Sequence, residues 1–424
     1  MPVLVDLIIK NASELLTLSA SFKEGSGLGM IQSGTIVVKE GRALWVGKTS
    51  ELPKDYRLGK DGQEIDAKGK VVMPGFIDSH THLVFAGSRE HEFEQRIQGV
   101  SYLEIAERGG GILSTVEATR RATFDELFLQ GKKRLDRMLS KGVTTAEAKS
   151  GYGLSLQDEL KILKVMRALQ EDHPIDIVPT FLGAHTVPKE FKNNRQQYID
   201  VLTEEMIPKV AQEGLAEFCD VFCEKQALYI EESRKILETG KRYGLKPKIH
   251  ADQLSSGGGA ELAAEVGAFS ADHLEYVSPV GIERLAEKRV TAVLLPGGSF
   301  FLSMKELPPA REIIERGVAV ALGTDLNPGS SMTESLPLIM TMGCTMLKMT
   351  PKEVIQATTI YAARSIDREN EIGSLDIGKQ ADVLILDIPN YRYLPYHFGV
   401  DHVELVIKKG RLVYERPGIY KNIL

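Results

Sequence analysis

Two histidines separated by one residue, His80 and His82, follow an apolar run in the stretch VVMPGFIDSHTHLVFAGSRE, residues 71–90. In an extended strand, residues two positions apart point to the same side, so both imidazoles would be directed at one point in space. Imidazoles that converge in this way are typical ligands of a metal ion. An isolated pair is more often structural, so the metal interpretation depends on the rest of the chain.

Strand-like apolar runs recur along the middle of the chain and alternate with amphipathic, helix-like stretches such as TFDELFLQGKKRLDRMLSKG. There are eight such runs, at residues 75–82, 142–149, 175–185, 216–224, 246–252, 268–274, 290–297 and 318–325. Eight strands that alternate with helices predict an α/β fold of the (β/α)8 TIM-type barrel class. A doubly wound open sheet is the alternative, but no GxGxxG motif follows the first run.

The two ends of the chain have a different texture. Runs such as GTIVVKEGRALWVGK and ADVLILDIP are short, apolar or alternating, and bounded by turn residues, which is typical of β-strands. The ends of a domain often lie close together. We therefore expect residues 1–72 and 372–424 to form one small composite β-sandwich domain, and residues 73–371 to form the barrel.

Composition narrows the partners and the compartment. A net charge of −6 argues against nucleic acid or an anionic membrane as the main partner. No apolar run approaches the length of a membrane span, and the first residues lack the pattern of a signal peptide. Three cysteines without a CxxC pair do not indicate disulfides. We expect a cytoplasmic protein whose partner is a small-molecule substrate.

In a TIM barrel, functional side chains lie at the carboxyl ends of the strands. Five of the nine histidines and one aspartate fall at such predicted ends: His80, His82, His185, His250, His273 and Asp325. Structural core histidines would account for one or two of these, but not for five. The cluster therefore predicts a metal site, for zinc first and for iron or manganese next.

The number of metal ions depends on whether a strand-end lysine is available to bridge two of them. A two-metal site needs a bridging ligand, and no lysine ends the fourth run to serve as one, so we expect one divalent or trivalent ion per chain. Lys149 ends the second run, and its simpler interpretation is a helix-entry or ion-pairing residue.

An ion in this cluster would act as a Lewis acid and activate a water molecule for attack on a carbonyl carbon. Asp325 would take the proton of the water, and His273 would orient the water or stabilise the developing oxyanion. The predicted chemistry is hydrolysis of a C–N bond beside a carbonyl. Arg89, seven residues after His82, could bind a carboxylate bidentately, although a surface ion pair with Glu90 or Glu92 is its simpler interpretation.

Several motifs resemble a known family. PGFIDSHTH, the strand-end residues His250, His273 and Asp325, and GSLDIGKQADVLILD at 373–387 are similar to the amidohydrolase superfamily. LVFAGSRE, GGGILSTVEATR, EAKSGYGL, FLGAHTVP, KIHADQL and LGTDLNPGSS, in this order, resemble the imidazolonepropionase family from about residue 70 to the C-terminus. The resemblance implies that water opens the ring of 4-imidazolone-5-propanoate to give N-formimidoyl-L-glutamate in histidine degradation. It also suggests a homodimer.

The resemblance also implies roles for individual residues. The metal ligands would be His80, His82, His250 and Asp325. The substrate would contact Arg89, Tyr152, His185, Gln253, Asn327, Gly329 and Ser330. Related amidohydrolases often carry glutamate at the position of Gln253, and an amide can orient a substrate but cannot transfer a proton near neutral pH. Gln253 is therefore assigned to substrate binding, and proton transfer to Asp325 and His273.

Two other functions remain open at this point. A deaminase or another cyclic amidase of the superfamily would use the same metal site. However, a substrate without a carboxylate tail would leave Arg89 and Tyr152 without a purpose. A non-catalytic scaffold with the same barrel would usually have lost one or more metal ligands, and all four candidates are present here.

Overall fold

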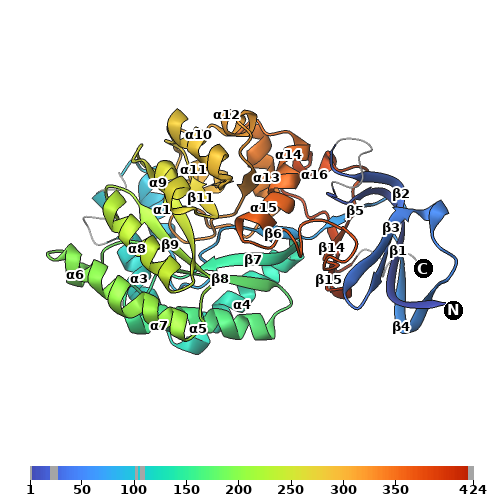
Figure 1. Ribbon diagram of the computed structural model, residues 1–424, viewed down its shortest axis with the longest axis horizontal. Helices are drawn as coiled ribbons and strands as arrows, with labels where there is room; N and C mark the ends of the chain where they lie inside the picture. The colour runs from blue at the N-terminus through green and yellow to red at the C-terminus, as the bar shows by residue number, and fades with distance from the viewer. Residues whose placement is uncertain (1, 20–26, 101–103, 106–109, 419–424) are drawn as a thin grey trace. The chain divides into compact units, whose positions relative to one another are not determined.

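The computed structural model describes residues 2–19, 27–100, 104–105 and 110–418 (Figure 1). This part of the chain contains two eight-stranded sheets. It divides into two compact units, one made of Met1–Asp78, Asp136–Thr145 and Ser335–Leu424, the other of Ser79–Leu135 and Ala146–Glu334. The sequence-based domain boundaries at residues 72 and 372 stay a prediction.

The first sheet is the barrel. Its strands are β6 (Phe76–Asp78), β7 (Val143–Lys149), β8 (Asp176–Ala184), β9 (Phe218–Cys223), β10 (Lys246–Ala251), β11 (Ser270–His273), β12 (Thr291–Leu294) and β13 (Val320–Leu322). They follow one another in sequence order across the sheet, and the pairs from β8 to β13 are parallel. A parallel bridge between Thr81 and Leu326 joins the segments that follow β6 and β13. Each predicted run contains one strand, and the prediction of a TIM-type barrel is confirmed.

Helices connect the barrel strands. They are α1 (Glu90–Ile97), α3 (Ile112–Arg121), α4 (Phe124–Ser140), α5 (Leu156–Asp172), α6 (Arg195–Asp200), α7 (Ile207–Gln212), α8 (Ile230–Arg242), α9 (Gly259–Val266), α10 (Pro279–Lys288), α11 (Pro296–Phe301) and α12 (Ala310–Glu315). Short helical turns lie at Thr49–Glu51, Lys189–Phe191 and Val201–Met206, and α13 (Leu336–Thr345), α14 (Pro351–Ala357), α15 (Ile360–Ser365) and α16 (Tyr393–Tyr396) follow the barrel.

Helix α5 shows why these segments form helices. Ser155 caps its first turn by accepting a hydrogen bond from the backbone N–H of Asp158. Its apolar residues Ile162, Val165, Met166 and Leu169 recur three or four positions apart and are buried. A helix with such a face must cover a sheet, which leaves the ends of the strands for the functional side chains.

The second sheet joins both ends of the chain, whose blue and red strands meet in Figure 1. Its strands are β1 (Val3–Leu16), β2 (Met30–Lys39), β3 (Arg42–Lys48), β4 (Tyr56–Asp66), β5 (Val71–Pro74), β14 (Val383–Leu386), β15 (Val403–Lys408) and β16 (Arg411–Glu415). Strand β14 pairs antiparallel with β5, so the C-terminal strands continue the N-terminal sheet. Leu7, Leu15, Val72, Val383 and Ile407 belong to one buried cluster in it. The predicted β domain from both termini is confirmed.

Membrane insertion finds no support among the helices. Within the described residues, none of them combines the length and the apolar composition that a transmembrane span requires.

Candidate active site

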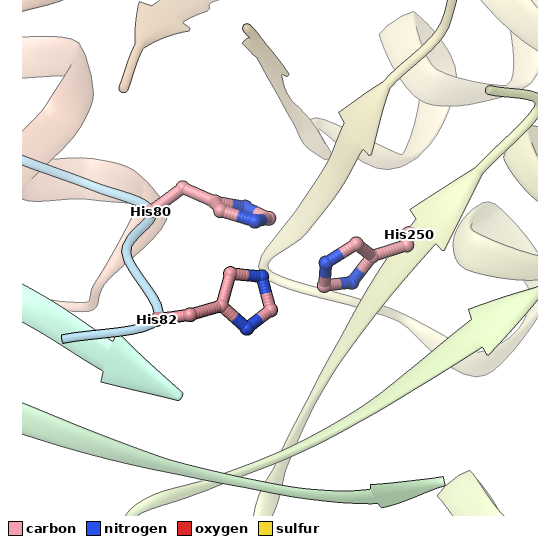
Figure 2. Close-up of side chains that lie close together, drawn as sticks. All are labelled: His80, His82 and His250. Atoms are coloured by element: carbon pink, nitrogen blue, oxygen red, sulfur yellow. The ribbon is translucent and has the colours of Figure 1, made fainter. Parts of the chain in front are cut away.

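Three histidines from two strand ends converge at one point. His80 and His82 follow β6, His250 lies in β10, and Figure 2 shows the three rings directed toward one another. Each ring can offer one nitrogen such that these atoms lie within 4.8 Å of one another. The rings of His80 and His250 have centroids 4.6 Å apart. The two-residue spacing of His80 and His82 therefore brings both imidazoles to one place, as the sequence predicts.

Asp325 lies close to two of these histidines, in the segment that follows the last barrel strand. It lies three residues after the last residue of β13, and its Oδ1 is 3.6 Å from Nε2 of His80 and 3.6 Å from Nε2 of His82. A second set of potential ligand atoms, from His80, His273 and Asp325, also lies within 4.8 Å. Because His80 belongs to both sets, they describe one mononuclear site rather than two separate ones.

Whether these residues fit a metal ion can be judged from the hydrogen bonding of their ring nitrogens. Within the described residues, Nε2 of His80, Nδ1 of His82 and both ring nitrogens of His250 are buried without a hydrogen-bond partner. Burial lowers the pKa of all three histidines well below its usual value, so each imidazole keeps a free lone pair at neutral pH. Buried polar atoms without partners are costly. A cation would satisfy them, so this donor set fits a metal ion.

The carboxyl group of Asp325 is suited to proton transfer. Its burial raises its pKa to about 6. The Oγ atom of Ser330 lies 3.3 Å from its Oδ2 and donates a hydrogen bond to it. Ser330 thus helps to orient the carboxylate, and the substrate contact that the resemblance implies for it stays a prediction.

His273 stands beside this carboxylate in an unusual backbone conformation. It ends β11 with a φ of 82°, and Leu274 follows with a φ of 70°. Such left-handed angles are uncommon for residues other than glycine and are concentrated at functional sites. Burial alone would lower the pKa of His273, but the carboxylates of Glu275 and Asp325 outweigh it and raise the pKa. His273 can therefore carry a proton near neutral pH.

Arg89 is buried rather than exposed. It immediately precedes α1, and its Nε donates to Oε2 of Glu92 at 2.8 Å, while its Nη2 lies 2.6 Å from the same oxygen. The other carboxylate oxygen of Glu92 accepts the N–H of Gly111 at 2.9 Å. The ion pair with Glu92 that the sequence suggests exists, but it lies within the protein. This buried ion pair holds the guanidinium in a fixed position, away from solvent.

The loop after β13 is shaped by one side chain. Oδ1 of Asn327 accepts the N–H groups of Gly329 and Ser330, each at 2.8 Å, and its Nδ2 donates to the carbonyl of Asp325 at 2.7 Å. Asn327 thus folds the NPGSS segment back on itself. The sequence places Asn327 in the substrate pocket, and the structure shows that its amide is occupied by the loop.

Tyr152 and His185 form an aromatic wall beside the converging histidines. The ring of His185 stacks on that of His82, with centroids 5.1 Å apart, and Tyr152 lies 5.4 Å from His185. Nδ1 of His185 is 3.0 Å from the carbonyl oxygen of Gly151, and burial lowers its pKa to about 4. His185 is therefore neutral at pH 7. Gln253 is largely buried in the loop that follows β10.

Sequence reasoning missed the acidic residues that hold these loops. Glu159 accepts the N–H groups of Gly151, Gly153 and Leu154, which flank Tyr152. Glu224 accepts the N–H groups of Leu254 and Ser255, next to Gln253. The only sequence signal is an acidic residue within a few positions of a glycine-rich loop or at a strand end. That signal is too common in proteins to be specific.

Comparisons with known proteins agree with this geometry. The model of the amidohydrolase family matches residues 71–413. An imidazolonepropionase of Alkaliphilus oremlandii (strain OhILAs) is 50% identical over 420 residues, which are 98% of this chain and 99% of that protein. An imidazolonepropionase of Brevibacillus brevis is 54% identical over 412 residues, which cover 96% of this chain and 97% of that protein.

Solved structures with lower identity share the fold. A zinc-bound adenosine deaminase from Xanthomonas campestris has a TM-score of 0.74 at 16% identity and covers 97% of this chain, with 93% of its own chain matched. A 5-methylcytosine deaminase from Klebsiella pneumoniae also has a TM-score of 0.74, at 17% identity, with 96% of this chain and 97% of that chain matched.

Proposed function

We propose roles for the residues of a chain that belongs to the amidohydrolase family and, within it, to the imidazolonepropionases. As a member of that family, the protein is a hydrolase of the cyclic amide in histidine degradation. The reaction is the addition of water to 4-imidazolone-5-propanoate to give N-formimidoyl-L-glutamate. The observation that carries the assignment of roles is the convergence of Asp325 and three neutral histidines at the strand ends, each histidine with a buried ring nitrogen that has no hydrogen-bond partner within the described residues.

One metal ion per chain is held by His80, His82, His250 and Asp325 in this proposal. Three imidazoles and a carboxylate suit zinc best and iron next. When bound, such an ion polarises a carbonyl group and lowers the pKa of water.

Asp325 and His273 handle the protons. In this proposal the Asp325 carboxyl accepts a proton from the attacking water. Ser330 keeps Oδ2 of Asp325 oriented during this transfer. His273, whose pKa is raised, is suited to donate a hydrogen bond to the oxygen on which negative charge develops.

The substrate is held at its two ends. Arg89 binds the propanoate, because a guanidinium matches a carboxylate bidentately and Glu92 already fixes its direction. Tyr152 and His185 line the ring of the substrate, and Gln253 orients it by hydrogen bonds. Gly329 and Ser330 close the pocket at the loop after β13, which Asn327 braces from within.

The cellular setting is part of the proposal. Degradation of an amino acid is a cytoplasmic process in bacteria, and the resemblance suggests a homodimer. Light scattering of the purified protein would measure the dimer directly, and a monomer at micromolar concentration would contradict it.

The decisive experiment follows the absorbance of freshly generated 4-imidazolone-5-propanoate with purified protein. Turnover should be lost on chelation and restored by zinc or iron. A metal-loaded protein without turnover would keep the metal site but move the substrate to another cyclic amide or amidine.

A deaminase or a different cyclic amidase is the competing function, and the propanoate tail distinguishes it. An analogue without the tail should be a poor substrate for the wild type. Arg89→Met should raise the KM for the tailed substrate and leave the KM for the tail-less analogue unchanged. Equal turnover of both substrates by the wild type would favour the competing function.

A further inference from the structure

Five charged side chains are fully buried on the barrel strands next to the metal ligands. They are Glu147 and Lys149 of β7, Asp220 of β9, Lys248 of β10 and Asp272 of β11, and each has an exposed fraction of 0%. Charges removed from water are tolerated only when they are paired with good geometry. Such a cluster therefore needs a reason, and catalysis as described above uses none of its members.

Lys149 is the centre of this cluster. Its Nζ lies 2.7 Å from Oδ2 of Asp220, 2.8 Å from Oε1 of Glu147 and 3.5 Å from Oδ2 of Asp272. Burial alone would lower the pKa of Lys149, but the three carboxylates outweigh burial and raise it, so the ammonium is charged. One cation thus holds carboxylates from three different strands.

Two of these carboxylates reach metal ligands. Oδ2 of Asp272 shares a hydrogen bond of 2.6 Å with Nδ1 of His80, whereas Oδ2 of Asp220 lies 3.1 Å from Nδ1 of His250, at ion-pair distance but without hydrogen-bond geometry. The same two oxygens face the Lys149 ammonium. Their other oxygens are also occupied, since Oδ1 of Asp272 accepts the hydroxyl of Ser270 and Oδ1 of Asp220 accepts the N–H of Val221. Each carboxylate therefore has a fixed direction.

A carboxylate at Nδ1 decides which nitrogen of a histidine binds a metal. It keeps the proton on Nδ1, orients the ring and leaves the lone pair of Nε2 for the ion. In the described part of the chain, Nε2 of His80 has no hydrogen-bond partner, which agrees with this tautomer.

The same strand supports the histidine pair through its backbone. The N–H of Lys149 donates to the carbonyl of Thr81, which stands between His80 and His82, at 2.9 Å. The hydroxyl of Thr81 donates to the carbonyl of Glu147 at 2.7 Å. Strand β7 thus positions the His80–His82 segment by main-chain contacts, and the Lys149 side chain adds contacts to the carboxylates that face the rings.

We propose that Lys149 is a positioning residue of the metal centre, which acts through Asp272 on His80 and through Asp220 on His250. One ammonium would thus set the positions of two ligands from different strands, and the tautomer of His80. This inference rests on the proposed metal site, and it assigns Lys149 neither a ligand nor a proton-transfer role.

The test measures zinc affinity, which needs no substrate. Metal-free protein is titrated with zinc in competition with a chromophoric chelator. Lys149→Met should weaken zinc binding by roughly 10- to 100-fold, the usual effect of losing a residue that orients a ligand. Lys408→Met is the matched control, because Lys408 is also buried, at 4% exposure, and pairs with Asp382 at 2.7 Å on the terminal sheet. It should leave zinc affinity unchanged.

Two further variants show whether Lys149 acts through the aspartates. Asp272→Asn, which preserves the size of the side chain, should weaken zinc binding by itself. In the Lys149→Met background it should add less than it does alone, because both changes release the same ring. Fully additive losses would overturn the proposal.

A double variant covers the case that Lys149→Met does not fold. Lys149→Met/Glu147→Gln removes one positive and one negative charge and so keeps the total charge of the cluster. It should fold and show the same loss of zinc affinity, even if Lys149→Met alone does not fold. Wild-type zinc affinity in either folded variant would overturn the proposal. A wild-type protein that binds neither zinc nor iron would instead contradict the proposed function.

Discussion

Gly329 lies against the guanidinium of Arg89. A Cβ atom built on Gly329 would stand 2.1 Å from Nη1 and 3.0 Å from Cζ of Arg89. Contacts this short do not occur between real atoms, so the side chain of Arg89 uses the space that the glycine leaves. The loop after β13 and the loop after β6 are thereby fitted to each other at the proposed carboxylate subsite.

Gly329→Ala should therefore displace the Arg89 guanidinium. Because Arg89 binds the substrate tail in our proposal, we expect the KM to rise about 10-fold or more, which corresponds to roughly 1.4 kcal/mol of binding. Metal content should not change. Gly257→Ala is the control, since its Cβ would meet nothing closer than 3.9 Å. Steady-state kinetics of both variants measure the effect. An unchanged KM for Gly329→Ala would show that Arg89 does not depend on the space left by Gly329.

Glu92→Gln should destabilise the protein in a pH-dependent way. Burial alone would raise the pKa of Glu92, but its hydrogen bond and ion pair with Arg89 outweigh burial and lower the pKa. A carboxyl with a lowered pKa stabilises the fold above its unfolded pKa of about 4.3, and this contribution is lost as the pH falls through the folded pKa.

We expect Glu92→Gln to cost about 1–3 kcal/mol at pH 7, because a buried guanidinium loses its charged partner. Below about pH 4 the difference from wild type should shrink. Urea unfolding at both pH values measures it, and Glu94→Gln, on the exposed side of the same helix, is the control. A difference that grows on acidification would refute this assignment.

Glu159→Gln should loosen the loop that carries Tyr152. The buried carboxylate accepts three backbone N–H groups, and an amide offers only one acceptor atom to them. We expect a loss of about 1–3 kcal/mol in the free energy of unfolding and a lower kcat/KM. The control is Glu126→Gln, because Glu126 caps an exposed helix start at Thr123. Equal kcat/KM in the two variants would show that the loop does not depend on Glu159.

His273→Ala should lower kcat far more than metal content. The ring lies beside Asp325 without being needed for the four-ligand set, so its loss removes the group that stabilises the oxyanion. A decrease of about 100-fold or more in kcat is expected. His397→Ala, on the terminal unit, serves as the control. Unchanged kcat with full metal content would remove His273 from the mechanism.

Metal removal should lower thermal stability as well as activity. In our proposal zinc binds the folded site and not the dispersed ligands of the unfolded chain, so free zinc at 1,000 times its Kd should stabilise the protein by about 4 kcal/mol. Thermal unfolding of the chelated and the zinc-loaded protein measures this difference. His82→Asn lacks one ligand, and a zinc-dependent shift as large as that of the wild type would place the ion elsewhere.

The strand ends could be predicted from the sequence because their signals are local. Eight apolar runs with helical stretches between them predicted the barrel, and His80, His82 and His250 were recognised by their place in those runs. Side-chain direction in a strand follows from the two-residue period alone. Neighbouring residues therefore determined that these imidazoles would face the same end of the barrel.

The partners of buried charges depended on the tertiary structure. Lys149, Asp220 and Asp272 lie 52 or more residues apart, and nothing near each of them indicates that the three meet. Barrel closure and strand register decide which side chains share a layer, and Lys149 pairs with Asp220 only because their strands reach the same level.

The roles of Arg89 and Asn327 also depended on contacts that only the tertiary structure forms. The sequence identified both as residues of the site, but whether each faces substrate or holds its own loop depends on contacts that form only on folding. The sequence by itself predicted the fold and the family, which are confirmed, and a set of metal ligands, which stays a proposal. Only the folded barrel decided which buried charges meet beside these histidines, because electrostatic partners are chosen by distance in space and not by distance along the chain.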